Sequence, residues 1–128
     1  MKIFGIGTDI VNIERMKKSL KKNNNFKNRI FSKSEILYCE KKNKPERCFA
    51  KRFAAKEALS KALGTGIRKG INLKDIKILN DSSGKPRINL SGTTKKFLKT
   101  KIKKRKYSIY LSLSDDIPWA QATVIISY

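Results

Sequence analysis

The sequence contains no histidine among its 128 residues. This absence excludes the Ser-His and Cys-His nucleophile arrangements and every metal site that uses histidine ligands. An enzyme built from this chain would have to draw its acid-base and metal chemistry from carboxylates, lysines and water. Only ten Asp and Glu residues are present to serve that chemistry.

Cysteines and long apolar segments are also scarce. Cys39 and Cys48 show neither C-x-x-C spacing nor a metal-ligand pattern, which predicts free thiols in a reducing cytosol. The opening residues, MKIFGIGTDI, lack the long apolar region of a signal peptide. No apolar run approaches the roughly 20 residues that span a bilayer. We therefore expect a cytoplasmic protein without a membrane partner.

The chain is strongly basic, with 31 Lys and Arg against 10 Asp and Glu and a net charge of +21. Such a surface attracts nucleic acid, acidic membranes, acidic proteins or phosphorylated small molecules. The 24 Lys against 7 Arg, together with many Asn and Ile, are also what coding drift toward A and T would produce. Charge alone therefore assigns no function.

The length suits a single domain comprising residues 1–128. Hydrophobic periodicity, caps and turn residues predict both helices and strands. Gly64, Thr65, Gly66 and Gly70 predict a flexible connector near the middle of the chain. The predicted elements are a strand at 2–11, helices at 12–22, 32–42 and 45–63, strands at 73–80 and 85–90, a basic helix at 93–105, and strands at 107–114 and 119–127.

The first strand has one face that glycines clear and that ends on Asp9. Glycine inside a strand often marks a place where another group approaches the backbone closely. The opposite, apolar face is predicted to lie on the core. A carboxylate at this position has a simpler alternative role, which is to cap the following helix. The two faces are Ile3, Gly5, Gly7 and Asp9, and Phe4, Ile6, Thr8 and Ile10.

The stretch RFAAKEALSK keeps Glu57 among cations on the helix predicted at 45–63. Glu57 and Lys61 are four residues apart and therefore lie on neighbouring rows of the helix. A common helix-stabilising pair, worth about 0.2–0.5 kcal/mol, is the alternative interpretation. The flanking alanines leave room for another body, and the apolar arc should face the core. The alanines are Ala50, Ala54 and Ala58, the arc is Phe49, Phe53, Leu59 and Leu63, and Arg52 and Lys56 border it.

Taken together, Asp9, Glu57 and Lys61 fit a site for magnesium and phosphate. Mg²⁺ usually takes one or two protein carboxylates and completes its shell with water and substrate phosphate oxygens. Lysine adds a mobile point charge for the same phosphate. None of this chemistry requires histidine.

Two stretches resemble the paired motifs of holo-acyl-carrier-protein synthase, a small 4′-phosphopantetheinyl transferase. They are GIGTDIVNIERM at 5–16 and FAAKEALSKALGTGI at 53–67. Three later stretches, GKPRI at 84–88, YLSLSDD at 110–116 and WAQATVII at 119–126, are similar to the family's later segments. The resemblance implies an α+β fold with helices packed on a mainly antiparallel sheet. It also implies a homotrimer with active sites between neighbouring subunits.

The resemblance implies an activity as well. The family transfers the 4′-phosphopantetheine arm of coenzyme A to a serine of apo-acyl carrier protein, in support of fatty acid biosynthesis. By resemblance, Asp9 and Glu57 hold Mg²⁺ against the coenzyme A pyrophosphate. Lys61 contacts that pyrophosphate and stabilises or protonates the leaving phosphate. Glu57 helps to deprotonate the serine, directly or through a metal-bound water, and the choice between these routes stays open.

Two further sets of residues follow from the same resemblance. One set would bind coenzyme A, and the other would dock the acidic helix of the carrier protein. Tyr110 departs from the pattern, since many relatives have histidine there; tyrosine can donate a hydrogen bond but is uncharged at neutral pH. The coenzyme A set is Arg52, Lys61, Gly64, Thr65, Gly66, Lys85, Pro86 and Ser112, and the docking set is Arg15, Lys18, Lys21 and Lys22.

Two other function classes compete with this interpretation. A nucleic-acid-binding module would use the charge and the stretch KIKKRKYSIY, where cations adjoin tyrosines. It gives no reason for Asp9 beside glycines or for Glu57 in the alanine row, so we expect no nucleic-acid partner. A membrane-surface protein would use the basic helix, whose apolar face is thin. Dependence on magnesium separates the enzyme from both rivals.

Overall fold

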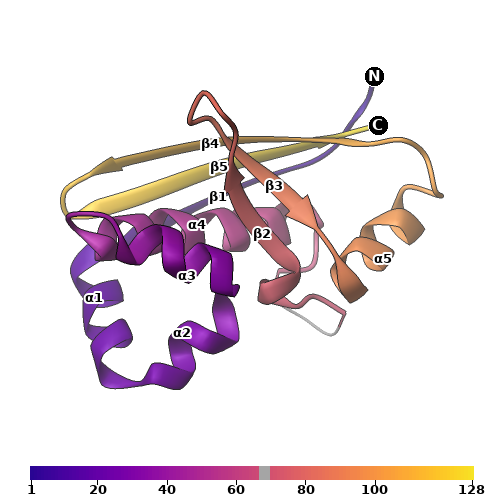
Figure 1. Ribbon diagram of the computed structural model, residues 1–128. Coiled ribbons are helices and arrows are strands. Elements are labelled where there is room, and N and C mark those ends of the chain that lie inside the picture. The colour runs from indigo at the N-terminus through magenta and orange to yellow at the C-terminus, as the bar shows by residue number, and fades with distance from the viewer. Residues whose placement is uncertain (67–69) are drawn as a thin grey trace.

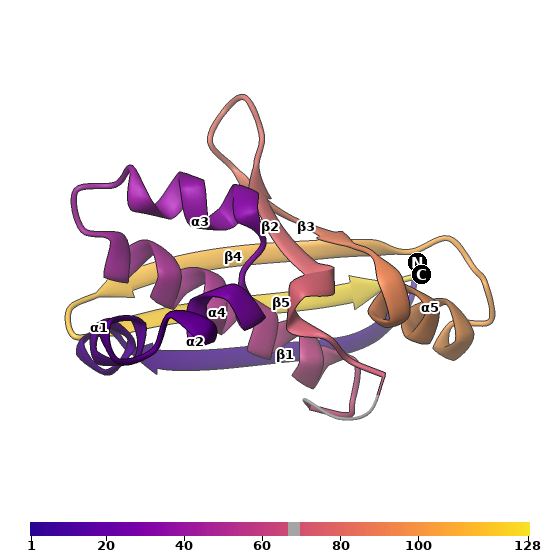
Figure 2. The ribbon, with the colours of Figure 1, turned by 60° about the horizontal axis from the view of Figure 1, so that its bottom comes forward.

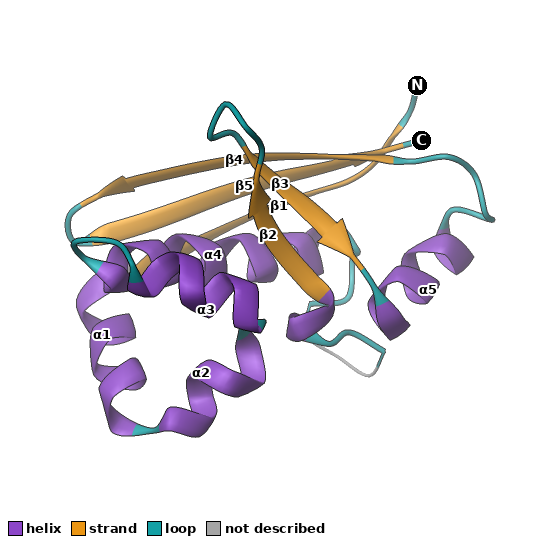
Figure 3. Cartoon of the chain, viewed as in Figure 1, coloured by secondary structure: helices purple, strands orange, loops and turns teal. Residues whose placement is uncertain are grey.

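The computed structural model describes residues 1–66 and 70–128, which form two antiparallel sheets and the helices packed on them (Figures 1 and 3). Residues 67–69, part of the predicted connector, lie outside the described residues. The larger sheet has three strands in the order β1-β5-β4. These are β1 at Ile3–Asn12, β4 at Ser108–Asp116 and β5 at Trp119–Ser127. The smaller sheet pairs β2 at Ile76–Asn80 with β3 at Pro86–Leu90. The predicted α+β class and antiparallel pairing are confirmed.

The helix α4, Pro45–Ala62, runs along one face of the three-stranded sheet (Figure 1). Helices α1, α2 and α3 lie at one end of α4. Helix α5 lies at the other end, near both chain termini (Figure 2). The hairpin β2–β3 crosses between them. The shorter helices are α1 at Ile13–Lys22, α2 at Asn24–Ile30, α3 at Lys33–Glu40 and α5 at Gly92–Lys101.

The predicted orientation of β1 is wrong. Ile6 and Ile10, expected on the core, are 65% and 60% exposed, and they lie on the sheet face opposite α4. The glycine face points at α4 instead. A Cβ atom at Gly5 would lie 1.9 Å from the carbonyl oxygen of Ala62, and one at Gly7 would lie 1.8 Å from that of Ala58. The two glycines allow the strand and helix backbones to touch, because neither position has a side chain to separate them.

The alanine row of α4 is the other half of this contact. Ala50, Ala54 and Ala58 are all completely buried. At Ala58, the body for which the row leaves room is strand β1 of the same chain. This close packing brings the end of β1 to the side of α4 that carries the predicted site. Of the arc predicted for the core, Phe49, Leu59 and Leu63 are buried, while Phe53 is only partly buried.

A second feature of α4 is Lys56, which is completely buried, as is its partner Glu35 of α3. Its Nζ donates to Oε1 of Glu35 at 2.9 Å and to the carbonyl oxygens of Leu73 and Ile76 at 2.9 and 2.6 Å. The other carboxylate oxygen of Glu35 accepts the N–H of Ile78 at 3.1 Å. This pair links the β2–β3 hairpin to α3 and α4. Lys56 was predicted only to border the core arc, but its side chain is completely buried.

Most predicted helix ends are confirmed. The side chain of Asn12 caps α1, Ser32 and Glu35 form the predicted capping box, and Pro45 opens α4. Helix α2 was not predicted, because the asparagine run at 23–25 is typical of a helix end. Strand β2 is shorter than predicted, since Leu73–Asp75 form a 3₁₀ turn. The basic helix ends at Lys101, earlier than predicted.

The prediction of free thiols is wrong. Cys39, in α3, and Cys48, in α4, form a disulfide. The turn between the two helices brings their Cα atoms to 5.4 Å, inside the usual range for a bridge. Spacing along the chain carries no information about this turn. Separately, among the helices of the described residues, none is both long and apolar enough to cross a membrane.

Candidate active site

The second half of β1 and the C-terminal half of α4 bring three predicted residues together. The Nζ of Lys61 lies 3.1 Å from Oδ1 of Asp9 and 3.0 Å from the carbonyl oxygen of Thr8. The side chain of Asp9 is 17% exposed and that of Lys61 is 52% exposed. Asp9 occupies this position because Gly5 and Gly7, on the same strand face, let the strand lie against the helix.

Glu57 completes this group. Partial burial raises the pKa of Glu57, the charge of Asp9 raises it further, and Lys61 opposes the shift. A carboxyl group whose pKa is raised beside a second carboxylate is a place where a cation would be favourable. Among the described residues, no cluster of three or more His, Cys, Asp or Glu side chains could hold a metal. A magnesium ion requires only one or two.

The structure removes both simpler alternatives for these residues. Lys61 forms its ion pair with Asp9 on another element, rather than with Glu57 one turn earlier on the helix. Asp9 does not cap α1, because the cap is the side chain of Asn12, which accepts from the backbone N–H of Arg15 at 2.9 Å. Neither acid is therefore explained by local helix chemistry.

A cavity of about 380 Å³ adjoins the two carboxylates. One wall is apolar, with the Phe26 and Phe53 rings 6.3 Å apart between centroids. Sequence reasoning missed this wall, because Phe53 matched the core pattern and Phe26 follows an asparagine run without periodicity. The lining residues are Asp9, Ile10, Val11, Asn12, Arg15, Met16, Ser19, Phe26, Phe53 and Glu57.

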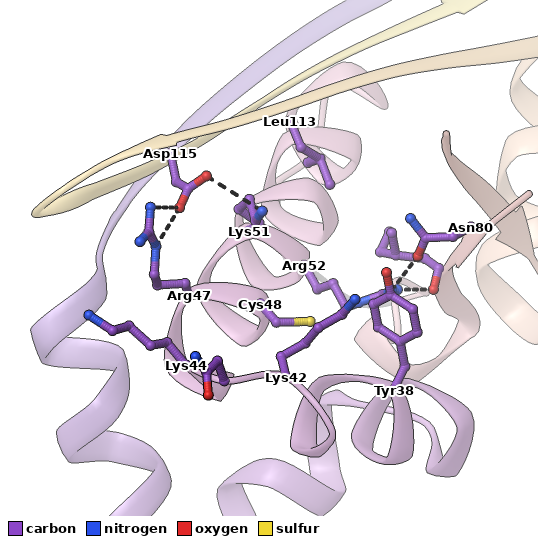
Figure 4. Close-up of a pocket in the computed structure, with 12 residues that line it drawn as sticks. Tyr38, Lys42, Lys44, Arg47, Cys48, Lys51, Arg52, Asn80, Leu113 and Asp115 are labelled. Carbon is purple, nitrogen blue, oxygen red and sulfur yellow. Dashed lines mark hydrogen bonds and ion pairs between the residues drawn. The ribbon is translucent and has the colours of Figure 1, made fainter. Parts of the chain in front are cut away.

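A larger cavity, of about 510 Å³, lies beside the start of α4 (Figure 4). We call it the basic cavity, because it is lined by Lys42, Lys44, Arg47, Lys51 and Arg52. Among the described residues that line it, the only acid is Asp115 of β4, which is paired with Arg47 at 2.7 Å and with Lys51 at 3.5 Å.

The structure places Arg52 in the basic cavity and away from the Asp9 group. Arg52 and Glu57 are five positions apart, which places them about 140° apart around the helix. Its guanidinium donates to the carbonyl oxygen of Ile78 and, at 2.6 Å, to Oδ1 of Asn80, and it stacks 4.4 Å from the ring of Tyr38. The side chain is therefore held by β2 on the far side of α4.

The predicted residues of the GKP turn meet strand β4. Lys85 and Pro86 line a cavity of about 480 Å³ together with Tyr110. Ser112 lies two residues further along β4, exposed on the same strand face as Tyr110. The structure therefore gathers these residues, but in a region that is separate from the cavity of Asp9 and Glu57.

The remaining predictions fall on the loop after α4 and on α1. Gly64 and Gly66 have φ angles of +83° and +61°, which only glycine adopts without strain, and added Cβ atoms would meet nothing within 4 Å. The loop backbone, including the half-buried Thr65, is thus open to an approaching group. The predicted docking residues are exposed on one side of α1, namely Arg15, Lys18, Lys21 and Lys22.

Comparison with known proteins identifies the family of this chain. A family model described as the 4′-phosphopantetheinyl transferase superfamily matches residues 5–119. The chain belongs to this superfamily. The holo-[acyl-carrier-protein] synthase of Pelagibacter ubique is 48% identical over 126 residues, which cover 98% of both chains. That of Aliivibrio fischeri is 50% identical over 127 residues, again covering 98% of both.

Solved structures of superfamily members have the same fold. A crystal structure of holo-[acyl-carrier-protein] synthase from Neisseria meningitidis matches with a TM-score of 0.87 and 38% identity, covering 98% of this chain and 99% of that one. The enzyme from Helicobacter pylori in complex with coenzyme A matches with a TM-score of 0.80 and 38% identity, covering 95% and 99%. The family and the transferase class predicted from the motifs are confirmed.

Proposed function

We propose that this protein transfers 4′-phosphopantetheine from coenzyme A to a serine of apo-acyl carrier protein, with Mg²⁺, in support of fatty acid biosynthesis in the cytoplasm. The observation that carries the proposal is the group of Asp9, Glu57 and Lys61 beside a cavity, in a chain of this superfamily. In this reaction the serine oxygen forms a bond to the β-phosphorus of coenzyme A. The bond to the leaving adenosine 3′,5′-bisphosphate breaks.

The donor set fits a magnesium ion. Asp9 and Glu57 supply hard carboxylate oxygens, and histidine and free thiols are missing. The ammonium of Lys61 already lies against Asp9, which supports the idea that this position accepts positive charge. When bound, Mg²⁺ would neutralise and orient the pyrophosphate, the usual contribution of a metal to phosphoryl transfer.

Each side chain of the group has a distinct role in the proposal. Asp9 and Glu57 would hold the metal. Lys61 would contact the pyrophosphate and stabilise or protonate the leaving phosphate. Glu57 would also help to accept the serine proton, directly or through a water molecule, and the choice between these two routes stays open.

We also propose a homotrimer whose active sites lie between subunits. One face of the three-stranded sheet carries exposed apolar side chains, including Ile6 at 65%, Tyr110 at 51% and Trp119 at 46%. A second copy that covers this face would remove them from water. The separation of the Arg52 and Pro86 regions from Asp9 within one chain supports the same arrangement. A neighbouring chain would then supply Lys85, Pro86 and Ser112 for the nucleotide part of coenzyme A, while Gly64, Thr65 and Gly66 pass beside it. Arg52, in the basic cavity, is a candidate for the nucleotide phosphates.

The carrier protein would dock beside the carboxylates. Arg15 both lines the cavity and stands on the cationic side of α1 with Lys18, Lys21 and Lys22. Acidic side chains on the carrier would meet these cations. The apolar wall of Phe26 and Phe53 would contact apolar side chains on the acidic helix of the carrier protein.

The test is intact mass spectrometry of an apo-acyl carrier protein incubated with this protein and coenzyme A, with Mg²⁺ or with EDTA. We expect a gain of one phosphopantetheine only with the metal. Asp9→Asn and Glu57→Gln should each lower the rate by at least about 100-fold, the usual size of losing one charge-stabilising group.

Glu40→Gln is the matched control. It removes the same charge from an exposed position at the end of α3, where Glu40 forms a surface ion pair with Lys27, and should leave the rate within about twofold. Transfer that persists in EDTA would contradict the metal assignment. No mass gain with several folded carrier proteins would contradict the activity. Light scattering of the purified protein tests the trimer separately.

A further inference from the structure

Lys61 is bound to the carboxylate that we assign to the metal. Two of the three donors of its ammonium are used by Oδ1 of Asp9, at 3.1 Å, and by the carbonyl oxygen of Thr8, at 3.0 Å. The lysine is 52% exposed, so it can leave this position without opening the core. The aspartate, at 17%, is held on the strand and stays in place.

We infer that Lys61 and the metal ion compete for Asp9, and that the pyrophosphate of coenzyme A ends this competition by giving Lys61 a new partner. The inference rests on the proposed function. Two cations beside one carboxylate repel each other, so each weakens the binding of the other. A pyrophosphate has oxygens enough to contact both cations at once.

Competition of this kind links the two ligands. The metal binds weakly alone, because it must displace Lys61, and more tightly once coenzyme A holds Lys61. By thermodynamic reciprocity the metal then strengthens coenzyme A binding by the same factor. Direct contact between metal and phosphate would also link them, and that part persists without Lys61. A variant at Lys61 therefore separates the two contributions.

The experiment uses the full-length protein without carrier protein and Mn²⁺ as the probe, with free Mn²⁺ counted by electron paramagnetic resonance. Wild type and Lys61→Met are titrated with and without coenzyme A. Without coenzyme A, Lys61→Met should bind Mn²⁺ about two- to fivefold more tightly, the range expected from exposed ion pairs. The factor by which coenzyme A tightens Mn²⁺ binding should fall correspondingly. Both readouts are independent of catalysis.

Two control variants separate the specific pair from general charge. Lys61→Arg keeps a cation that suits a carboxylate, and should bind Mn²⁺ without coenzyme A as wild type does. Lys51→Met removes the same charge from the same helix, where Lys51 is also paired with an aspartate, Asp115 at 3.5 Å. It should leave Mn²⁺ affinity without coenzyme A unchanged.

Two results would overturn the inference. One is Mn²⁺ binding by Lys61→Met that is no tighter than that of wild type without coenzyme A. The other is an effect of Lys51→Met as large as that of Lys61→Met, because net charge alone would then suffice. Asp9→Asn shows whether the metal assignment or only the competition is wrong. If it retains full Mn²⁺ affinity, the metal assignment in the proposed function falls as well; if it loses affinity, only the competition falls.

Discussion

Two of the lysine–carboxylate pairs on helix α4 have nearly equal lengths and opposite character. Lys56 lies 2.9 Å from Glu35 with both side chains fully buried, and Lys61 lies 3.1 Å from Asp9 with the lysine 52% exposed. Five residues separate the two lysines, which places them about 140° apart around the helix. One pair faces α3 and β2, and the other faces the end of β1 and solvent.

The difference shows how surroundings assign a role to the same two chemical groups. The ammonium of Lys56 donates three hydrogen bonds within the protein and both side chains of the pair are fully buried, so the pair is closed to a ligand. Burial lowers the pKa of Lys56, and the charge of Glu35 opposes this shift. The side chain of Lys61 is half-exposed and lies beside Asp9 and Glu57. Its hydrogen bond to Asp9 can therefore be exchanged for a contact with a ligand. The first pair is therefore structural, and the second is the one to which we propose a functional role.

The largest expected effect comes from breaking the buried pair. Lys56→Met should lower the free energy of unfolding by about 3–5 kcal/mol, because it leaves Glu35 charged and unpaired in the interior. Lys61→Met, the same change in the exposed pair, should alter it by less than about 1 kcal/mol. Urea unfolding of both variants measures this contrast.

The double variant Lys56→Met with Glu35→Gln checks the cause. Removing both charges should recover part of the loss, since the penalty lies mainly in the stranded carboxylate. If Lys56→Met unfolds as easily as Lys61→Met does and no more, the two pairs are equivalent and the comparison is wrong.

A smaller effect is expected where β1 meets α4. Gly7→Ala places a methyl group 1.8 Å from the carbonyl oxygen of Ala58 and should destabilise the protein by about 1–3 kcal/mol, as overpacking usually does. In Gly64→Ala, the added methyl group meets no atom within 4 Å. Only the φ angle of +83° disfavours alanine, so the substitution should destabilise the protein by about 1 kcal/mol.

The two glycine variants should differ more in activity than in stability. Gly7→Ala moves the strand that carries Asp9 away from Lys61, so phosphopantetheine transfer should fall further than the unfolding data explain. Assaying both variants at saturating Mg²⁺ and coenzyme A shows whether the spacing of strand and helix matters. Equal residual activities in the two variants would argue that it does not.

The same contact explains what could and could not be predicted from the sequence. The glycines at 5 and 7 indicated a close approach, and the alanine row on the helix indicated room for another body. Each half was recognised, but periodicity cannot show that the two halves meet each other. The apolar residues Ile6 and Ile10 were therefore assigned to the core, although they lie on a face that a single chain leaves uncovered.

Local signals were dependable where the chemistry is local. The capping box of Ser32 and Glu35 is visible in the sequence because its partners are three residues apart. The second task of Glu35, which is to bind Lys56 across 21 residues, leaves no such signal. The disulfide of Cys39 and Cys48 was missed for the same reason, since only the fold sets the distance between its two ends.

The smallest expected effect concerns Glu57, and its sign is informative. Burial, with the charge of Asp9, raises the pKa of Glu57 above its ordinary value of 4.5. Below that value the carboxyl is protonated in both folded and unfolded chains and contributes nothing. Above the raised pKa it is ionised in both, and the folded state bears the unfavourable charge. Glu57→Gln should therefore stabilise the protein at neutral pH, by about 0.5 kcal/mol because solvent screens a half-exposed group.

The gain should shrink as the pH falls through the raised pKa and vanish below about 4.5, where wild type and variant become equivalent. Asp115→Asn is the opposite case: burial raises the pKa of Asp115, but the hydrogen bond from Arg47 and the charge of Lys51 outweigh it and leave the pKa lowered. That variant should lose stability at neutral pH. Urea unfolding at several pH values compares the two.

A Glu57 variant that is less stable than wild type at pH 7 would mean that Glu57 supports the fold, and that its place beside Asp9 is structural after all. A variant that is more stable but inactive would show that the protein retains a destabilising carboxylate for its chemistry.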